Sequence, residues 1–161
     1  MLYAIAAADT ENGLGFQGQL QFHIREDLRR FAALTRGHAV IYGRKTLETF
    51  PGGKPLKDRE NIILSRTPGY EVEGATVVSS VKEALRVCGD DAFVIGGGSV
   101  YRQFWSLIDV LYLTRVHIAA PRDVTLPDIN KDFTLTETSE IMKDEKSGLT
   151  YQFLTYTRKA G

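Results

Sequence analysis

Short apolar runs alternate with segments of helical periodicity through the first two thirds of the chain. Apolar runs of about four to eight residues predict strands, and apolar residues spaced three or four apart predict helices. The expected strands are Leu2–Ala8, Ala39–Tyr42, Asn61–Ser65, Thr76–Ser79, Ala92–Ile95, Val110–Val116, Phe133–Thr138 and Thr150–Thr157. The expected helices are Glu26–Thr35, Lys45–Thr49, Val81–Cys88 and Ser99–Leu107. This alternation predicts an α/β fold.

The last two expected strands follow one another without a helix between them, which predicts an antiparallel hairpin.

The helix before Gly89 has well-marked ends. Ser80 and Glu83 have capping-box spacing, in which each side chain binds the backbone N–H of the other residue, and Gly89 supplies a left-handed stop. We interpret this helix as scaffold.

Composition narrows the class of protein. With 161 residues, 43% of them hydrophobic, the chain is expected to form one domain, 1–161. The formal net charge is zero, so composition predicts no general attraction to nucleic acid or to a membrane. Cys88 is the only cysteine, and no stretch resembles a leader or a membrane span. We therefore expect a soluble, cytoplasmic protein.

Three consecutive glycines stand between the strand 92–95 and the helix 99–107. Gly96, Gly97, Gly98 and Ser99 could offer backbone N–H groups to a phosphate at the start of a helix. However, Tyr101 stands where the dinucleotide-binding fingerprint has its third glycine. These residues alone leave a phosphate site and a tight turn that binds nothing equally open.

Two further strand ends carry cationic and hydroxyl groups. The segment VIYGRKT places Arg44, Lys45 and Thr46 after a strand, and IILSRT places Ser65 and Arg66 after the next. Ligands of open α/β sheets bind outside the carboxyl ends of the strands, so these groups could serve one multiply phosphorylated molecule. The alternative is that each arginine is merely solvated.

Asp27 lies on the apolar stripe of the helix 26–35, which also carries Ile24, Leu28 and Phe31. Its carboxylate could occupy an apolar pocket, accept two hydrogen bonds from an amidine-like ligand and exchange a proton. Alternatively, it could only favour the positive end of its helix. The glycines of the preceding segment, NGLGFQG, predict a mobile loop rather than a regular element.

These motifs together resemble the dihydrofolate reductase family along nearly the whole chain. The resemblance rests on IAA near the start, NGLG, the helix with Asp27, GRKT, NIILS, VIGGG-x-VY and YLTR, in that order. It implies an eight-stranded, mostly parallel sheet with about four flanking helices. It also implies hydride transfer from NADPH to C6 of dihydrofolate, with protonation at N5.

The resemblance assigns site residues by position. Asp27, Phe22 and Leu20 take the catalytic positions. The implied substrate-binding residues are Ile5, Ala7, Asp27, Leu28, Phe31, Phe50, Leu56, Arg59, Ile95, Tyr101 and Thr114, with Arg59 on the carboxylate of the glutamate tail. The implied NADPH-binding residues are Ala7, Leu14, Gly15, Gly43, Arg44, Lys45, Thr46, Leu64, Ser65, Arg66, Ile95, Gly96, Gly97, Gly98, Ser99 and Val100. A cis peptide between Gly96 and Gly97 is also implied, and Arg44, Ser65 and Arg66 would surround the 2′-phosphate.

The chain departs from the family pattern before the acidic helix. Gln21 and Phe22 replace a usual proline and tryptophan, so the indole N–H donor is lost and the loop is less restricted. Asp123 stands in a segment with altered neighbours, DVTLP, and is expected to hold closed the mobile loop that contains NGLGFQG.

Two alternative functions remain from the sequence: an NADPH-dependent pyrimidine reductase of riboflavin synthesis, and a non-catalytic nucleotide-binding module. Asp27 and Arg59 favour the folate enzyme. His23, His38 and His117 lack metal-ligand spacing, so no metal is expected. The expected partners are dihydrofolate and antifolate inhibitors, with no nucleic acid and no membrane, and a monomer is expected.

Overall fold

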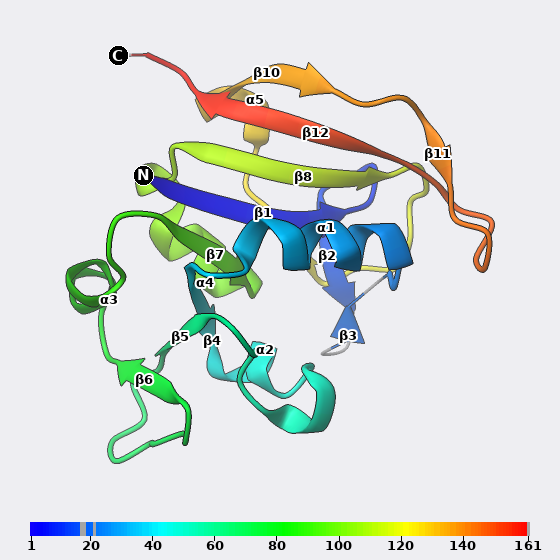
Figure 1. Ribbon diagram of the computed structural model, residues 1–161. Coiled ribbons are helices and arrows are strands. Elements are labelled where there is room, and N and C mark those ends of the chain that lie inside the picture. Colours follow the sequence, from blue (N-terminus) through cyan, green and yellow to red (C-terminus); the bar gives the residue numbers. More distant parts are fainter. Residues whose placement is uncertain (17–18, 21, 161) are drawn as a thin grey trace.

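A central sheet with helices on both faces organises the molecule (Figure 1). The computed structural model describes residues 1–16, 19–20 and 22–160. The order of strands in this sheet is β10-β12-β8-β1-β7-β4-β5-β6. Their bounds are β1 Leu2–Ala8, β4 Ala39–Gly43, β5 Glu60–Leu64, β6 Ala75–Val78, β7 Ala92–Gly96, β8 Val110–Val116, β10 Phe133–Thr138 and β12 Thr150–Arg158. A short strand, β11 (Met142–Lys143), pairs only with β12.

Strand direction divides the sheet into two parts. From β6 across to β8, each pair of neighbouring strands is parallel, and β1 pairs with both β7 and β8. β12 is antiparallel to β8 and to β10. The expected α/β class, the mostly parallel sheet and the antiparallel C-terminal strands are therefore confirmed.

Alternation along the strands separates the two larger hydrophobic clusters of the described residues, and a smaller third cluster contains Ile24, Val116 and Tyr151. On β4, Val40 and Tyr42 belong to one hydrophobic cluster, whereas Ala39 and Ile41 belong to the other. Successive side chains of a strand point to opposite faces, so the clusters lie on opposite sides of the sheet. The face with Tyr42 is covered by α1 (Arg25–Thr35) and α2 (Arg44–Leu47). The other face is covered by α3 (Val81–Val87) and α4 (Gly98–Phe104).

The helices show small departures from the sequence-based expectation. α4 is followed by a 3-10 turn, η2 (Trp105–Leu107), and a second, η1 (Pro51–Gly53), precedes β5. A short fifth helix, α5 (Ile129–Asp132), was not expected. Ser80 accepts from the backbone N–H of Glu83 as expected, but the Glu83 carboxylate binds the N–H and hydroxyl of Ser79 instead of the Ser80 N–H.

A second, small sheet corrects one expectation. The glycine-rich segment after β1 was expected to be a loop without regular structure, but Gly13–Phe16 forms β2. β2 pairs with β3 (Gln19–Leu20) and with β9 (Val124–Thr125), both antiparallel. The pairing between β2 and β9 joins segments more than 100 residues apart, which local composition does not reveal.

None of the helices in the described ranges combines the length and the apolar character needed to cross a bilayer.

Candidate active site

A cavity of about 530 Å³ opens at the carboxyl ends of β1, β4 and β7. This volume is in the range of small-molecule sites. Its wall is mostly apolar, and Asp27 is the one carboxylate among the described residues that line it. The residues that line it are Ile5, Ala6, Ala7, Leu14, Gly15, Phe22, His23, Asp27, Leu28, Phe31, Lys45, Thr46, Thr49, Phe50, Pro51, Leu56, Arg59, Ile95, Gly96, Gly97, Gly98, Tyr101 and Val124.

The Asp27 carboxylate projects from the first turn of α1 toward β8. Thr114 of β8 donates its hydroxyl hydrogen to Oδ1 of Asp27 over 2.5 Å. Burial raises the pKa of Asp27 above its usual range, whereas the bond from Thr114 and the positive charge of Arg30 act in the opposite direction. Asp27 is thus a carboxyl group that can hold a proton closer to neutral pH than an exposed aspartate can.

Arg30 carries a positive charge three residues after Asp27, on the same face of α1. Its guanidinium lies 4.4 Å from the ring centroid of Phe153 and 5.4 Å from that of Tyr112. These aromatic faces attract the cation and hold it in place. Burial lowers the pKa of Arg30, while Asp27 raises it. Arg30 was not singled out from the sequence.

Tyr101 joins the glycine-rich junction to the central strand. Its hydroxyl donates to the carbonyl oxygen of Ile5 over 2.6 Å, and the side chain is only 4% exposed. Burial raises the pKa of Tyr101, and the charge of Asp27 adds to this effect. Tyr101 therefore remains a neutral hydrogen-bond donor that fixes α4 against β1.

The glycine-rich junction between β7 and α4 forms part of the cavity wall. The peptide bond between Gly96 and Gly97 is cis, and Gly96 has a φ of 134°. A Cβ on Gly98 would lie 2.3 Å from Cγ1 of Val124, which no ordinary packing allows. The junction therefore brings bare backbone to the cavity, and only glycine permits the approach of β9 to Gly98.

Three neighbouring strand ends carry the groups that the sequence assigned to a phosphorylated ligand. β7, β4 and β5 are adjacent in the sheet, so their carboxyl ends lie side by side. Arg44, after β4, donates to the Thr67 hydroxyl over 3.5 Å and lies 4.7 Å from the ring centroid of Tyr70. The sequence-based expectation that these strand ends share one site is consistent with their order.

Arg59, which also lines the cavity, is held by its neighbours. Its Nε donates to the carbonyl oxygen of Lys57 over 2.8 Å, and one Nη donates to the Thr35 hydroxyl over 3.2 Å. Its guanidinium lies 5.9 Å from the ring centroid of Phe31. Arg59 is therefore oriented at the cavity wall, where it can receive an anionic group.

A family model described as dihydrofolate reductase matches residues 1–158. The chain belongs to the dihydrofolate reductase family. It is 36% identical to the dihydrofolate reductase of Bacillus subtilis, covering 99% of this chain and 95% of the relative. It is 34% identical to a type 3 dihydrofolate reductase of Salmonella typhimurium, covering 99% of each.

A solved dihydrofolate reductase has the same fold. The structure from Enterococcus faecalis, complexed with NADP(H) and RAB-propyl, superposes with a TM-score of 0.90 and is 32% identical. The alignment covers 99% of this chain and 97% of that one. The fold of this chain is therefore that of a dihydrofolate reductase.

Most residues expected from the resemblance to dihydrofolate reductases lie in the cavity wall. Those expected for substrate all line it except Thr114, which lies behind Asp27 and binds its carboxylate. Several expected cofactor residues lie outside the lining, at the strand ends or beneath the surface: Gly43, Arg44, Leu64, Ser65, Arg66, Ser99 and Val100.

Two expected features fall wholly or partly outside the described residues. Leu20 pairs through its backbone with Gly15, but its side chain is not among the described groups. Gln21 lies outside the described residues altogether. Phe22 lines the cavity. The Asp123 backbone N–H donates to the Gly15 carbonyl over 3.0 Å, so its segment does contact the loop.

The cavity also contains residues that sequence analysis did not assign to the site: Ala6, His23, Thr49, Pro51 and Val124. Thr49 and Pro51 flank the expected Phe50, so proximity could have suggested them. Val124 reaches the cavity only because β9 pairs with β2. Within the described residues, no group of three histidine, cysteine or acidic side chains is arranged to hold a metal ion.

Proposed function

We propose that the protein reduces 7,8-dihydrofolate to 5,6,7,8-tetrahydrofolate with NADPH. The observation that carries the proposal is the partly buried Asp27 carboxylate, hydrogen-bonded to Thr114 and facing a largely apolar cavity. A carboxylate in this setting fits a planar ligand edge with two N–H donors. The relatives and the solved neighbour, all named dihydrofolate reductase, support the same activity.

The substrate half of the proposed site lies between α1 and the segment around Phe50. Asp27 would bind the pterin and hold the proton that N5 requires, because burial keeps its pKa high. Leu28, Phe31, Phe50 and Leu56 would enclose the ring system and exclude water. Arg59, at the wall of the same cavity, would bind the carboxylate of the glutamate tail.

The residues at the other half fit a dinucleotide. The backbone at Gly98 has no room for a side chain toward Val124, and Arg44 and Lys45 add positive charge at the next strand end. Arg44, Ser65 and Arg66 would bind a 2′-phosphate, which favours NADPH over NADH. When bound, the nicotinamide supplies the hydride to C6.

Phe22 distinguishes the wall of this site from the family pattern. It retains an aromatic surface in the cavity but offers no indole N–H. The proton path to Asp27 would therefore depend on the Thr114 hydroxyl and on water near it rather than on a donor from residue 22.

Dihydrofolate-dependent oxidation of NADPH tests the function. We expect rapid loss of NADPH absorbance with wild-type protein, and a decrease of at least about 100-fold in hydride-transfer rate at pH 7 for Asp27→Asn, because its proton-donating group is gone. The amide keeps an oxygen that accepts from Thr114, so folding and NADPH binding should persist.

Glu26→Gln is the matched control. Glu26 precedes Asp27 on α1 and pairs with Arg29 at 3.0 Å, with both side chains more than half exposed. It should retain wild-type turnover. NADPH oxidation with the ribosylated pyrimidine and none with dihydrofolate would instead support the pyrimidine reductase. NADPH binding without NADPH oxidation by either substrate would support the non-catalytic nucleotide-binding module.

We further infer a cytoplasmic monomer formed by one domain, 1–161. The two larger hydrophobic clusters share a single continuous sheet, which supports one folding unit. Sedimentation of the purified chain would measure its oligomeric state.

A further inference from the structure

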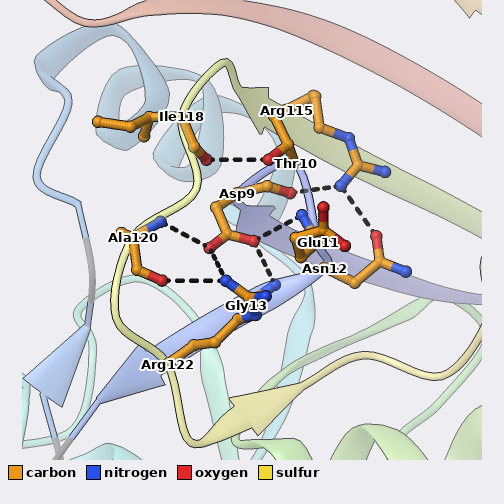
Figure 2. Close-up of polar contacts among 9 residues, drawn as sticks. All are labelled: Asp9, Thr10, Glu11, Asn12, Gly13, Arg115, Ile118, Ala120 and Arg122. Carbon is orange, nitrogen blue, oxygen red and sulfur yellow. Dashed lines mark hydrogen bonds and ion pairs between the residues drawn. The ribbon is translucent and has the colours of Figure 1, made fainter.

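Asp9, directly after β1, lies outside the cavity wall and is fully buried, with 0% exposure. Figure 2 shows its carboxylate surrounded by groups from two segments. Oδ1 accepts from the backbone N–H of Glu11 over 2.8 Å and from that of Gly13 over 2.7 Å. Oδ2 accepts from the backbone N–H of Ala120 over 3.2 Å. The two oxygens thus bind different segments.

Two arginines reinforce the same junction (Figure 2). Arg122 lies 3.5 Å from Oδ2 of Asp9 and donates to the Ala120 carbonyl over 3.1 Å. Arg115 donates to the Asp9 carbonyl over 2.6 Å and to Oδ1 of Asn12 over 2.8 Å. A junction thus joins the turn 9–13 to the segment 115–122, and it is formed by Asp9, Arg115 and Arg122.

The packing at this junction is close. A Cβ on Gly13 would lie 2.6 Å from Cδ of Arg122 and 2.8 Å from Oδ2 of Asp9. A buried carboxylate is stable only when its oxygens are hydrogen-bonded and its charge is paired. Movement of the segment 115–122 away from the turn would remove both the Ala120 bond and the Arg122 charge, so the buried carboxylate opposes that movement.

The two joined segments continue into the cavity wall. Gly13 pairs with Thr125 and Gly15 with Val124, and the Leu126 N–H donates to the Asn12 carbonyl over 2.9 Å. Leu14 and Gly15 on one segment and Val124 on the other line the cavity beside Gly98. The position of this wall therefore depends on the junction beneath it.

We propose that Asp9 is a positioning residue: its buried carboxylate sets the relative placement of β2 and β9 and thereby the wall that contacts the cofactor. This inference rests on the proposed function, because it takes the glycine-rich side of the cavity to be the NADPH side. Asp9 acts through Leu14, Gly15 and Val124 and touches no reacting atom.

Asp9→Asn separates the two halves of the junction. An asparagine oxygen can still accept from Glu11 and Gly13, but its NH₂ group would face the Ala120 N–H and Arg122, which are also donors. The turn should persist while its attachment to the other segment is lost. We expect the Kd for NADPH, measured by fluorescence without substrate, to rise about tenfold, equivalent to about 1.4 kcal/mol, with the Kd for dihydrofolate within about twofold. Amide exchange should accelerate at Gly13–Gly15 and at 123–126.

Asp109→Ala, which removes the acceptor oxygen, is the control for a purely structural effect. Asp109 binds the other end of the same strand, since its Oδ2 accepts from the Leu2 N–H over 2.9 Å, and it does not line the cavity. Its replacement should lower Tm without changing either Kd selectively. Equal effects of both variants on Tm, with no selective loss of NADPH affinity for Asp9→Asn, would overturn the proposal.

Arg122→Gln keeps the proposal testable if Asp9→Asn does not fold. Its side chain is partly exposed, at 33%, so its loss is easier to accommodate. A selective rise of the NADPH Kd by at least about threefold supports the role of the junction, and an unchanged Kd overturns it. Because these are binding measurements, they remain informative even if wild-type protein does not reduce dihydrofolate.

Discussion

At the residue scale, the charge state of Asp27 is set by opposing influences. Burial raises its pKa, whereas Thr114 from β8 and Arg30 from α1 lower it. Tyr101 and Tyr151 also lie within its electrostatic reach, and both have pKa values raised in part by the Asp27 charge. Arg30 is the only one of these groups that carries a positive charge, and it lies three residues along the same helix face.

Removal of the Arg30 charge should therefore shift the pH profile. Arg30 lowers the pKa of Asp27, so Arg30→Gln should raise it. If Asp27 must be protonated, hydride transfer declines as pH rises through this pKa, and the variant should retain its rate to higher pH than wild type. Single-turnover hydride transfer measured from pH 5 to 9 checks this, with Arg30→Lys expected to restore the wild-type midpoint.

Arg29→Gln controls for overall charge. Arg29 is the neighbouring residue, is 59% exposed and pairs with Glu26. It should leave the midpoint where it is, because solvent screens an exposed charge. A midpoint for Arg30→Gln that stays unchanged or moves down would show that Arg30 does not influence Asp27.

The sequence predicted some site residues and missed others for a physical reason. Asp27 stood out locally, as a carboxylate on the apolar stripe of one helix, but the family resemblance was needed to assign it to the site. Arg30 was missed because its importance depends on Tyr112 and Phe153, which are remote in sequence. Asp9 was missed likewise, since Ala120 and Arg122 become its partners only after folding.

At the element scale, the approach of β9 to the start of α4 limits what the glycine-rich junction can tolerate. A Cβ on Gly98 would lie 2.3 Å from Cγ1 of Val124 and 3.8 Å from its Cβ. Arg102 of α4 also holds β9, donating to the Thr125 carbonyl over 2.8 Å. The strand therefore cannot shift away without breaking this bond.

Gly98→Ala should lower stability by about 1–3 kcal/mol, the usual cost of overpacking, and should weaken NADPH binding. Thermal unfolding and cofactor titration measure the two effects. In Gly98→Ala combined with Val124→Ala, the Cγ1 atom is gone and the remaining contact is ordinary, so part of both losses should be recovered. Strictly additive effects in this double-mutant cycle would rule out the steric explanation.

Regular elements were predictable where their signal was local. Long apolar runs identified the strands of the central sheet, and the Ser80 cap marked the start of α3, with bounds shifted by one or two residues. β2 and β9 were not predictable, because two short segments pair only through contacts across the fold. The composition of NGLGFQG predicted a loop, and this was wrong for Gly13–Phe16, because pairing with β9 overrides the local preference.

At the scale of the whole molecule, the sequence predicted the α/β class but not the order of the strands. The position of β1 between β7 and β8 follows from pairings across about 90 to 110 residues, which no local pattern specifies. The family resemblance predicted an eight-stranded, mostly parallel sheet, and periodicity predicted its individual strands, but neither gave the order of the strands.

Cofactor binding should stabilise the entire fold. A ligand that binds only the native state at 100 times its Kd adds about 2.7 kcal/mol to the free energy of unfolding. We therefore expect NADPH to raise Tm by about 5–10 °C, and NADH at the same concentration to raise it less. Differential scanning calorimetry with and without each nucleotide measures this.

Arg44→Gln provides the comparison. It removes a cation at the end of β4 while leaving the cavity lining intact. It should reduce the thermal shift produced by NADPH and leave the NADH shift nearly constant. Equal losses for both nucleotides would place the 2′-phosphate away from Arg44.

The central place of β1 also determines when the site can form during folding. β1 is synthesised first among the strands, but its partners β7 and β8 span 92–96 and 110–116. The apolar side chains of β1 therefore stay exposed while most of the sheet is synthesised. Parallel pairing over such separations is slow and leaves intermediates prone to aggregation. The arrangement that builds the cavity wall from Ile5 to Ala7 thus also leaves the apolar faces of β1 exposed in the nascent chain until β8 has been made.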